Sequence, residues 1–248
     1  CALPISDKPD RWEWHVCPCC PPMFLKIMAA MPGYIYAYQG DNVYVNLFIG
    51  SEVRVPVGKS NSVRLKQLTS YPWHGAVSIQ VNPDKASTFS MKVRIPGWAQ
   101  GTENPYDLYQ SNLKAPVKLK VNQEDVLLRI VDGYAEINRE WKKGDHIELE
   151  LPMQPRLITA NKAVENLRGQ VALASGPIIY CFEDADNPEL QTFKLQAQTP
   201  LELSHDSNLL NGVNIIKCQG DIPAKAIPYY AVANREESHS YKVWIPQK

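Results

Sequence analysis

The chain has 248 residues, which is enough for one large hydrophobic core or two ordinary ones. Its 26 basic and 26 acidic residues balance and form no basic stripe, so the charge pattern argues against nucleic acid or an anionic membrane as a partner. No apolar run approaches a transmembrane span, and the first residues do not resemble a signal peptide. These features leave the cellular compartment open. Because the chain begins at Cys1 without an initiator Met, we expect a piece of a longer protein.

The segment Cys17-Pro-Cys-Cys-Pro-Pro22 places three thiols within four positions. Proline is tolerated in the first turn of a helix, so the two final prolines predict a helix start, with Met23 to Met31 as the helix body. Cys19 and Cys20 then lie at the helix N-terminus, where unpaired backbone N–H groups and the helix dipole favour a thiolate. The pattern therefore indicates a nucleophile or a ligand for a soft metal.

Three interpretations of this cysteine cluster stay open: a metal or nucleophile site, buried inert cysteines, or a redox pair. A disulfide between adjacent cysteines is unfavourable, because the bridge needs Cα atoms about 4.4–6.8 Å apart and suitably directed Cβ atoms. Thiolates select zinc or copper(I), and a zinc site takes three or four protein ligands. The nearest candidates for further ligands are Cys1, Glu13 and His15.

From Gly33 onward the sequence alternates apolar and polar residues, which is typical of β-strands. The residues Gln39-Gly-Asp-Asn42 predict a tight turn between two strands. We expect strands over residues 34–38, 43–48, 53–57, 63–68, 77–81, 89–95, 117–121, 126–130, 134–137 and 146–151. A second set is expected over 171–174, 178–182, 193–196, 213–217, 227–233 and 241–245.

Short strands at this spacing predict a mainly β fold with two antiparallel β-sandwich domains, preceded by a short helical piece. The expected domains are residues 1–33, with the cysteine motif, residues 34–156 as the first sandwich, and residues 157–248 as the second. The apolar side chains of Met23 to Met31 should lie partly exposed, because this helical piece has no domain of its own.

Other residues that carry chemistry have ordinary structural explanations as well. Tryptophans in a sandwich can stack on sugar rings or pack in the core, and scattered histidines are usually solvated. An acidic turn can bind calcium or simply join two strands. The residues concerned are Trp73, Trp98, Trp141, His74, His146, His205, His239, Asp184, Asp186 and Asn187.

Six segments together carry a family resemblance: Cys17-Pro-Cys-Cys-Pro-Pro22, Tyr71-Pro-Trp-His-Gly75, Arg94-Ile-Pro-Gly-Trp98, Arg139-Glu-Trp-Lys-Lys-Gly-Asp145, Gly176-Pro-Ile-Ile-Tyr180, and the ending Ile227-Pro-Tyr-Tyr230 to Trp244-Ile-Pro246. In this order they resemble the C-terminal portion of glycoside hydrolase family 127, the bacterial β-L-arabinofuranosidase family, with family 146 as a close relative. The segments span nearly all of the chain, and the cysteine motif is the specific one among them.

The resemblance implies a catalytic (α/α)₆ barrel ahead of two β-sandwiches, with the cysteine motif near the end of the barrel. It implies that Cys19 is the nucleophile, which attacks the anomeric carbon and gives a thioglycosyl intermediate with net retention. Zinc, bound by Cys19 and Cys20, would hold the nucleophile as a thiolate. The residues expected near this site are Cys17, Glu13, Trp14 and His15.

The chain also departs from the family. Barrel helices that would supply the acid/base Glu, the zinc-binding Glu and a partner Cys lie ahead of the motif, where this chain has only 16 residues. Met23 stands where the family often has Asn, and His74 where it often has Asp. We therefore expect the intact protein to be a glycosidase and this chain alone to be inactive.

A second function stays open, namely a non-catalytic β-sandwich module for carbohydrate binding or for dimerisation. The two functions differ at Cys19 and Cys20, because only the enzyme requires both thiols beside a metal site. The expected partners are a carbohydrate substrate, the missing N-terminal helical barrel and, through a sandwich, a second copy of the chain.

Overall fold

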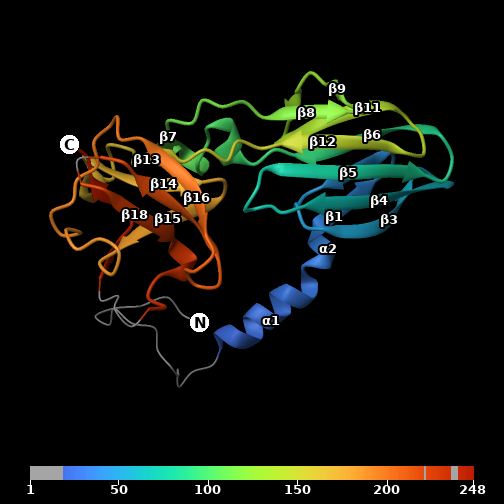
Figure 1. Ribbon diagram of the computed structural model, residues 1–248. Helices are drawn as coiled ribbons and strands as arrows, with labels where there is room; N and C mark the ends of the chain where they lie inside the picture. The colour runs from blue at the N-terminus through green and yellow to red at the C-terminus, as the bar shows by residue number, and fades with distance from the viewer. Residues whose placement is uncertain (1–18, 221, 236–239) are drawn as a thin grey trace. The chain divides into compact units, whose positions relative to one another are not determined.

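The computed structural model describes residues 19–220, 222–235 and 240–248, and the chain is mainly β-strand (Figure 1). It divides into two compact units. One contains residues 25–100 and 115–153, and the other contains residues 19–24, 101–114 and the described residues of 154–248. Among the described residues, none of the helices has the length and apolarity needed to cross a membrane.

Two helices precede the strands. Helix α1 (Cys20–Ala30) begins one residue before the first of the two prolines, close to the expected start, and α2 (Pro32–Ile35) follows it. None of the residues of α1 is buried. The exposure predicted for its apolar side chains is therefore confirmed.

The first unit is a β-sandwich of two sheets. One sheet has the order β1 (Tyr36–Gln39), β2 (Asn42–Val45), β6 (Ser87–Arg94), β11 (Tyr134–Trp141) and β10 (Ile130–Val131). The other has the order β3 (Ser51–Val57), β4 (Asn61–Thr69), β5 (Ala76–Pro83), β12 (Asp145–Glu150), β8 (Lys118–Val121) and β9 (Glu124–Asp125). The pairing is antiparallel, as expected, except between β2 and β6, which run parallel.

The core of this unit follows from the strand period of two, because every second side chain points inward. Leu65 of β4 lies opposite Val81 of β5, and Ile79 lies opposite Ile147 of β12. All four side chains are completely buried. Burial of each such side chain contributes about 1.5–3 kcal/mol to stability.

Gly75, just before β5, allows two backbone segments to approach closely. A Cβ atom at this position would lie 2.0 Å from the carbonyl oxygen of Leu151, so no other residue fits without a backbone shift. The Leu151 N–H donates a hydrogen bond to the Gly75 carbonyl oxygen, with an N···O distance of 3.0 Å. The Tyr71–Gly75 motif thus has a structural role in the sandwich.

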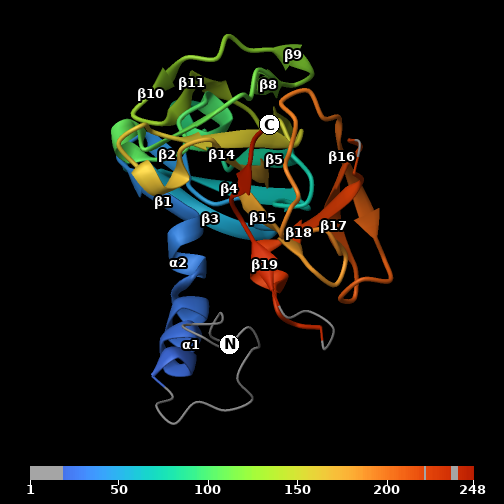
Figure 2. The same cartoon turned by 90° about the vertical axis from the view of Figure 1, so that its left-hand side faces the viewer.

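The second unit contains one nine-stranded, curled sheet (Figure 2). Its main path has the order β16 (Leu201–Asp206), β17 (Val213–Cys218), β18 (Ala224–Pro228), β15 (Ile178–Glu183), β14 (Gln170–Ser175), β13 (Arg156–Ala160) and β7 (Tyr109–Ser111). Strands β19 (Tyr241–Lys242) and β20 (Ile245–Pro246) pair with β15 and β14 respectively. Strands β14 and β15 pair with each other only near their turn. Farther from the turn, the C-terminal strands β19 and β20 pair with them instead.

Strand β7 joins this sheet although it comes from the middle of the chain. A buried ion pair holds the segment that contains it: Arg156 Nε lies 2.6 Å from Glu103 Oε1, and its terminal nitrogen lies 2.8 Å from Oε2. The third guanidinium nitrogen donates to the Gly176 carbonyl oxygen at 2.7 Å, in the turn between β14 and β15. One side chain thus ties residues 101–114 to the hairpin.

Several elements differ from the sequence-based expectation. Strands β7, β13 and β16 were not expected. Strands β7 and β16 lie at the two ends of the sheet, where short or partly polar strands carry little apolar alternation, and β13 (Arg156–Ala160) is a short inner strand with a continuous buried start instead of an alternating pattern. Residues 193–196 form no strand, and only Leu195 makes an isolated bridge, to Gln247. Residues 227–233 are strand only up to Pro228, after which a 3₁₀ turn, η4 (Tyr229–Ala231), follows. The remaining 3₁₀ turns are η1 (Gly97–Gln100), η2 (Pro105–Asp107) and η3 (Glu165–Leu167).

Candidate functional site

Cys19 and Cys20 lie at the start of α1, and both are exposed free thiols. Their Sγ atoms are 3.9 Å apart, too far for a disulfide, whose S–S bond is about 2.05 Å long. Neither thiol is packed into a core, so the interpretation as buried inert cysteines does not apply to this pair. The pair is therefore accessible to a metal ion or an electrophile.

The separation of the two sulfurs fits one tetrahedral zinc ion. With Zn–S bonds of about 2.3 Å and a tetrahedral angle, two ligating sulfurs lie about 3.8 Å apart, close to the observed distance. Within the described part of the chain no cluster of three or more His, Cys, Asp or Glu side chains is arranged to hold a metal. Cys19 and Cys20 could thus supply two of the four donors of a tetrahedral site, and the described residues place no third His, Cys, Asp or Glu donor beside them.

The other residues expected near this site cannot be placed. Cys1, Glu13, Trp14, His15 and Cys17 lie outside the described residues, so their expected roles stay predictions.

Cys181 and Cys218 differ from the exposed pair because both are buried in strands of the second unit. Burial raises the pKa of the Cys218 thiol to about 12. Burial also raises the pKa of Cys181, and the Glu183 carboxylate adds to this, while Arg235 opposes it. Both thiols therefore stay protonated and unreactive in the folded chain.

The tryptophan and histidine candidates differ in their burial and in their hydrogen-bond partners. Trp141 is fully buried, and its indole N–H donates to the Phe89 carbonyl oxygen at 3.0 Å. His146 lies 3.2 Å from a Glu148 oxygen, and His205 contacts Asn214 at 3.0 Å. Of the remaining candidates, Trp98 is buried, Trp73 is partly exposed, His74 is exposed, and His239 lies outside the described residues.

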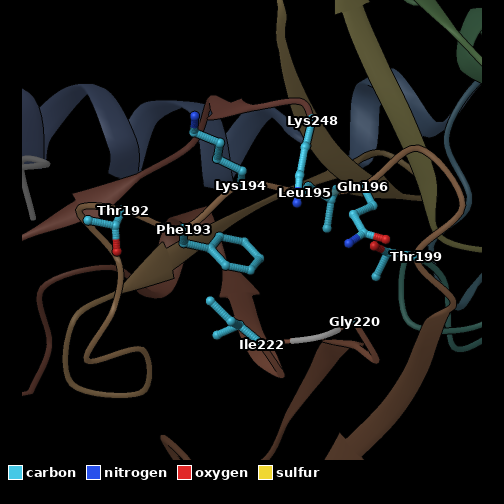
Figure 3. Close-up of a pocket in the computed structure, with 9 residues that line it drawn as sticks. All are labelled: Thr192, Phe193, Lys194, Leu195, Gln196, Thr199, Gly220, Ile222 and Lys248. Atoms are coloured by element: carbon cyan, nitrogen blue, oxygen red, sulfur yellow. The ribbon is translucent and has the colours of Figure 1, made fainter.

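A hollow of about 280 Å³ lies on the second unit (Figure 3). The described residues around it come from the segment between β15 and β16, from the β17–β18 connection and from the last residue given. Sequence reasoning did not find this hollow, because its walls come from three separate segments.

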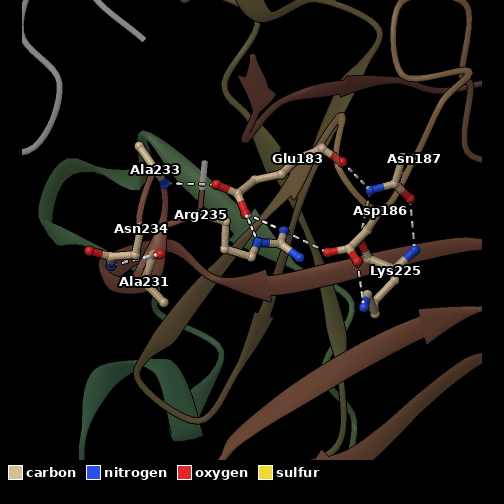
Figure 4. Close-up of polar contacts among 8 residues, drawn as sticks. All are labelled: Glu183, Asp186, Asn187, Lys225, Ala231, Ala233, Asn234 and Arg235. Carbon is tan, nitrogen blue, oxygen red and sulfur yellow. Dashed lines mark hydrogen bonds and ion pairs between the residues drawn. The ribbon is translucent and has the colours of Figure 1, made fainter. Parts of the chain in front are cut away.

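The acidic turn after β15 is held by an ion-pair network (Figure 4). Asp186 pairs with Lys225 at 2.5 Å and with Arg235 at 2.7 Å, and Arg235 also pairs with the fully buried Glu183. The Asn187 amide donates to the carbonyl oxygens of Glu183 and Lys225. These contacts join the turn after β15 to Lys225 in β18 and to Arg235. Sequence reasoning missed Arg235 and Lys225, because both lie far from Asp186 along the chain.

The charges around Asp186 also lower the pKa of its carboxyl group. Burial alone would raise the pKa of this carboxyl group, but hydrogen bonds and charges from Arg235 and Lys225 outweigh burial. The pKa of Asp186 therefore lies below its usual value. The carboxylate stays ionised at neutral pH and keeps the network closed.

Comparison with known families gives two matches that together span most of the chain. Residues 42–153 match the model for "Beta-L-arabinofuranosidase, GH127 middle domain". Residues 155–246 match the model for "Glycoside hydrolase family 127 C-terminal domain". The boundary between the two matches falls just before β13.

Individual relatives agree with these matches. A non-reducing end beta-L-arabinofuranosidase of Bifidobacterium longum subsp. longum is 28% identical over 93% of this chain and 38% of its own length. The solved structure of a GH127 beta-arabinofuranosidase is 34% identical, with a TM-score of 0.88 over 96% of this chain and 40% of its own. A GH127 beta-L-arabinofuranosidase from Geobacillus stearothermophilus T6 is 34% identical, with a TM-score of 0.85 over 97% of this chain and 39% of its own.

The chain thus spans about two fifths of the length of these relatives. The two matched segments, the sequence identity and the shared fold agree with one another across nearly the whole chain. The chain belongs to glycoside hydrolase family 127 and corresponds to its middle and C-terminal domains.

Proposed function

We propose that this chain is the C-terminal part of a zinc-dependent retaining glycoside hydrolase that releases L-arabinose from β-L-arabinofuranosides. The single observation that carries the proposal is the exposed Cys19–Cys20 pair at the start of α1, with a sulfur separation suited to one zinc ion. The names of the relatives support the substrate class, since they are β-L-arabinofuranosidases.

Cys19 is the nucleophile in this proposal. Its sulfur forms a bond to the anomeric carbon as the glycosidic C–O bond breaks, and the leaving oxygen takes a proton from a general acid. Water then replaces the sulfur at the same carbon, which gives net retention. Bound zinc would lower the pKa of the thiol, and Cys19 and Cys20 would be its ligands in this chain.

The general acid and the remaining zinc donors would come from the part of the family fold that this chain does not span. In a protein with the family's full length, that part would cover the exposed apolar side chains of α1 and complete the sugar pocket. Because a general acid typically contributes 10²–10⁴-fold, the 248-residue chain alone should show no detectable turnover.

The test uses a protein in which this chain is joined to the rest of the family's length. Cys19→Ser and Cys20→Ser are compared with Cys218→Ser, which removes a buried thiol of the second unit. L-Arabinose release and bound zinc are measured on the same samples. Cys19→Ser should abolish release, Cys20→Ser should lose zinc together with activity, and Cys218→Ser should keep both. Near-normal release by Cys19→Ser would overturn the nucleophile assignment.

A further inference from the structure

The outward face of the six-stranded sheet in the first unit carries a hollow along β5, whose neighbours β4 and β12 are labelled in Figure 1. Beneath it, Val77 of β5 and Leu149 of β12 are buried in the core of the sandwich, so the floor of the hollow is fixed. All of its lining residues lie in the continuously described range 19–220. We call this hollow the β5 trough, and its outward-facing side chains are Leu68, Ala76, Ser78, Lys118, Lys120, Glu148 and Glu150.

Small side chains on β5 create the trough. Ser78 lies opposite Leu68 of β4 on one side and opposite Glu148 of β12 on the other. Ala76 lies opposite Glu150 in the next row of the sheet. The longer side chains of β4 and β12 are separated by two strand spacings of about 4.8 Å each, with only the short side chains of β5 between them. The resulting volume of about 360 Å³ suits one small ligand.

The charged side chains of the β5 trough balance one another. Glu148 of β12 lies opposite Lys120 of β8, and Glu150 lies opposite Lys118. Among the described residues neither of these lysines forms an ion pair, so their ammonium groups remain able to donate to a ligand. Two ammonium and two carboxylate groups cancel, and the trough therefore does not select an ion by its net charge. The ammonium groups donate, the carboxylates accept, and the Ser78 hydroxyl does both, which matches a neutral ligand with several hydroxyl groups.

We propose that the β5 trough binds one neutral sugar unit of the glycan, with Glu148 and Glu150 accepting hydrogen bonds from sugar hydroxyls and Lys120 donating to a sugar oxygen. The Leu68 side chain, which is 50% exposed, then lies against the C–H groups of the sugar ring. The choice of a neutral, hydroxyl-rich ligand rests on the side chains of the trough, whereas the choice of arabinose rests on the proposed function. Such a site holds the glycan without breaking any bond.

The test titrates the 248-residue chain with methyl β-L-arabinofuranoside and follows backbone amide shifts by NMR. L-Arabinitol is the matched control, because it carries the same kind of hydroxyl groups on an open chain without a ring. The arabinofuranoside should shift the amides of Val77, Ser78 and Leu149 with a dissociation constant in the millimolar range. L-Arabinitol should bind at least about threefold more weakly, since an open chain loses more conformational freedom on binding than a closed ring does.

Two variants locate the site, each with a matched control. Ser78→Leu fills the trough with a side chain that an exposed strand position tolerates, and it should weaken arabinofuranoside binding more than about tenfold. Gln80→Leu makes the same kind of change at the next outward position of β5, outside the lining, and should leave the dissociation constant unchanged. Glu150→Gln removes the charge of one acceptor and should weaken binding severalfold, whereas Glu124→Gln, at an exposed carboxylate of β9 outside the trough, should not.

Three results would overturn the proposal. The first is equal binding of L-arabinitol, and the second is unchanged binding by Ser78→Leu. The third is a shift of the trough amides that follows the protein concentration instead of the sugar concentration, which would make this face a contact between two copies of the chain. Binding is measured without turnover, so failure here leaves the proposed hydrolase untouched. Failure of the hydrolase would appear in the release of L-arabinose and would leave the amide shifts of β5 as they are.

Discussion

Helix α1 leaves all of its side chains exposed, whereas the strands of both β units bury alternate side chains in dense cores. The Tyr71–Gly75 motif is explained by packing, because Gly75 must pass close to Leu151. The Cys19–Cys20 pair is exposed, and among the described residues the contact given for the two thiols is with each other. This difference teaches that packing within the described residues accounts for the Tyr71–Gly75 motif but not for the two exposed thiols.

The largest expected contrast is in thiol reactivity. With iodoacetamide, Cys19 and Cys20 should react in the folded chain more than about 1000-fold faster than Cys181 and Cys218, because the buried thiols need an opening that costs several kcal/mol. Mass spectrometry of peptides after timed quenching measures the rates. In denaturant all four rates should converge. Comparable rates in the folded chain would show that the second unit is open.

Breaking the buried Arg156–Glu103 pair should strongly destabilise the second unit. Arg156→Met leaves the Glu103 carboxylate buried without its partner, which should cost about 3–5 kcal/mol. Hydrogen exchange of peptides from β13 to β15 measures the loss. The matched surface change Arg168→Met breaks an exposed pair with Glu165 and should cost at most about 1 kcal/mol. Equal effects of both changes would contradict the role given to Arg156.

Adding one methyl group at Gly75 should destabilise the first unit. Gly75→Ala places its Cβ against the Leu151 carbonyl oxygen and should cost about 1–3 kcal/mol, seen as faster hydrogen exchange in β5 and β12. Gly33→Ala is the control, since no atom lies within 4 Å of a Cβ there. If the amide hydrogen exchange rates of β5 and β12 are the same in both variants, the close approach of Gly75 to Leu151 does not affect the stability of the first unit.

The smallest expected effect is on the stability of the second unit at low pH. The folded-state pKa of Asp186 is depressed, so its contribution to stability is complete above about pH 4 and is lost as the pH falls through the folded value. Stability of the second unit should therefore decline below about pH 4, and less steeply in Asp186→Asn. Asp84→Asn removes a partner of the exposed Arg54 and should leave the slope unchanged. If stability falls with pH below about 4 as steeply in Asp186→Asn as in the unchanged chain, the ionised Asp186 carboxylate does not stabilise the second unit.

The sequence predicted the mainly β fold and the helix start, because alternating apolar residues and paired prolines act locally. It did not predict that β7 joins the second unit, since this depends on Arg156 and Glu103, which are 53 residues apart. It placed the cysteine pair correctly at a helix start. The hollow beside Lys248 could not be predicted, because segments distant in the chain assemble it.

The most direct test of the central claim is to find the atom that carries the sugar during turnover. The protein with the family's full length is mixed with a β-L-arabinofuranoside, quenched in acid and digested, and the peptide that contains Cys19 is sequenced by mass spectrometry. The account predicts a mass increase of one pentosyl residue on Cys19, absent in Cys19→Ser. A pentosyl group on a carboxylate, or turnover with no adduct on Cys19 while product forms in a burst, would contradict it.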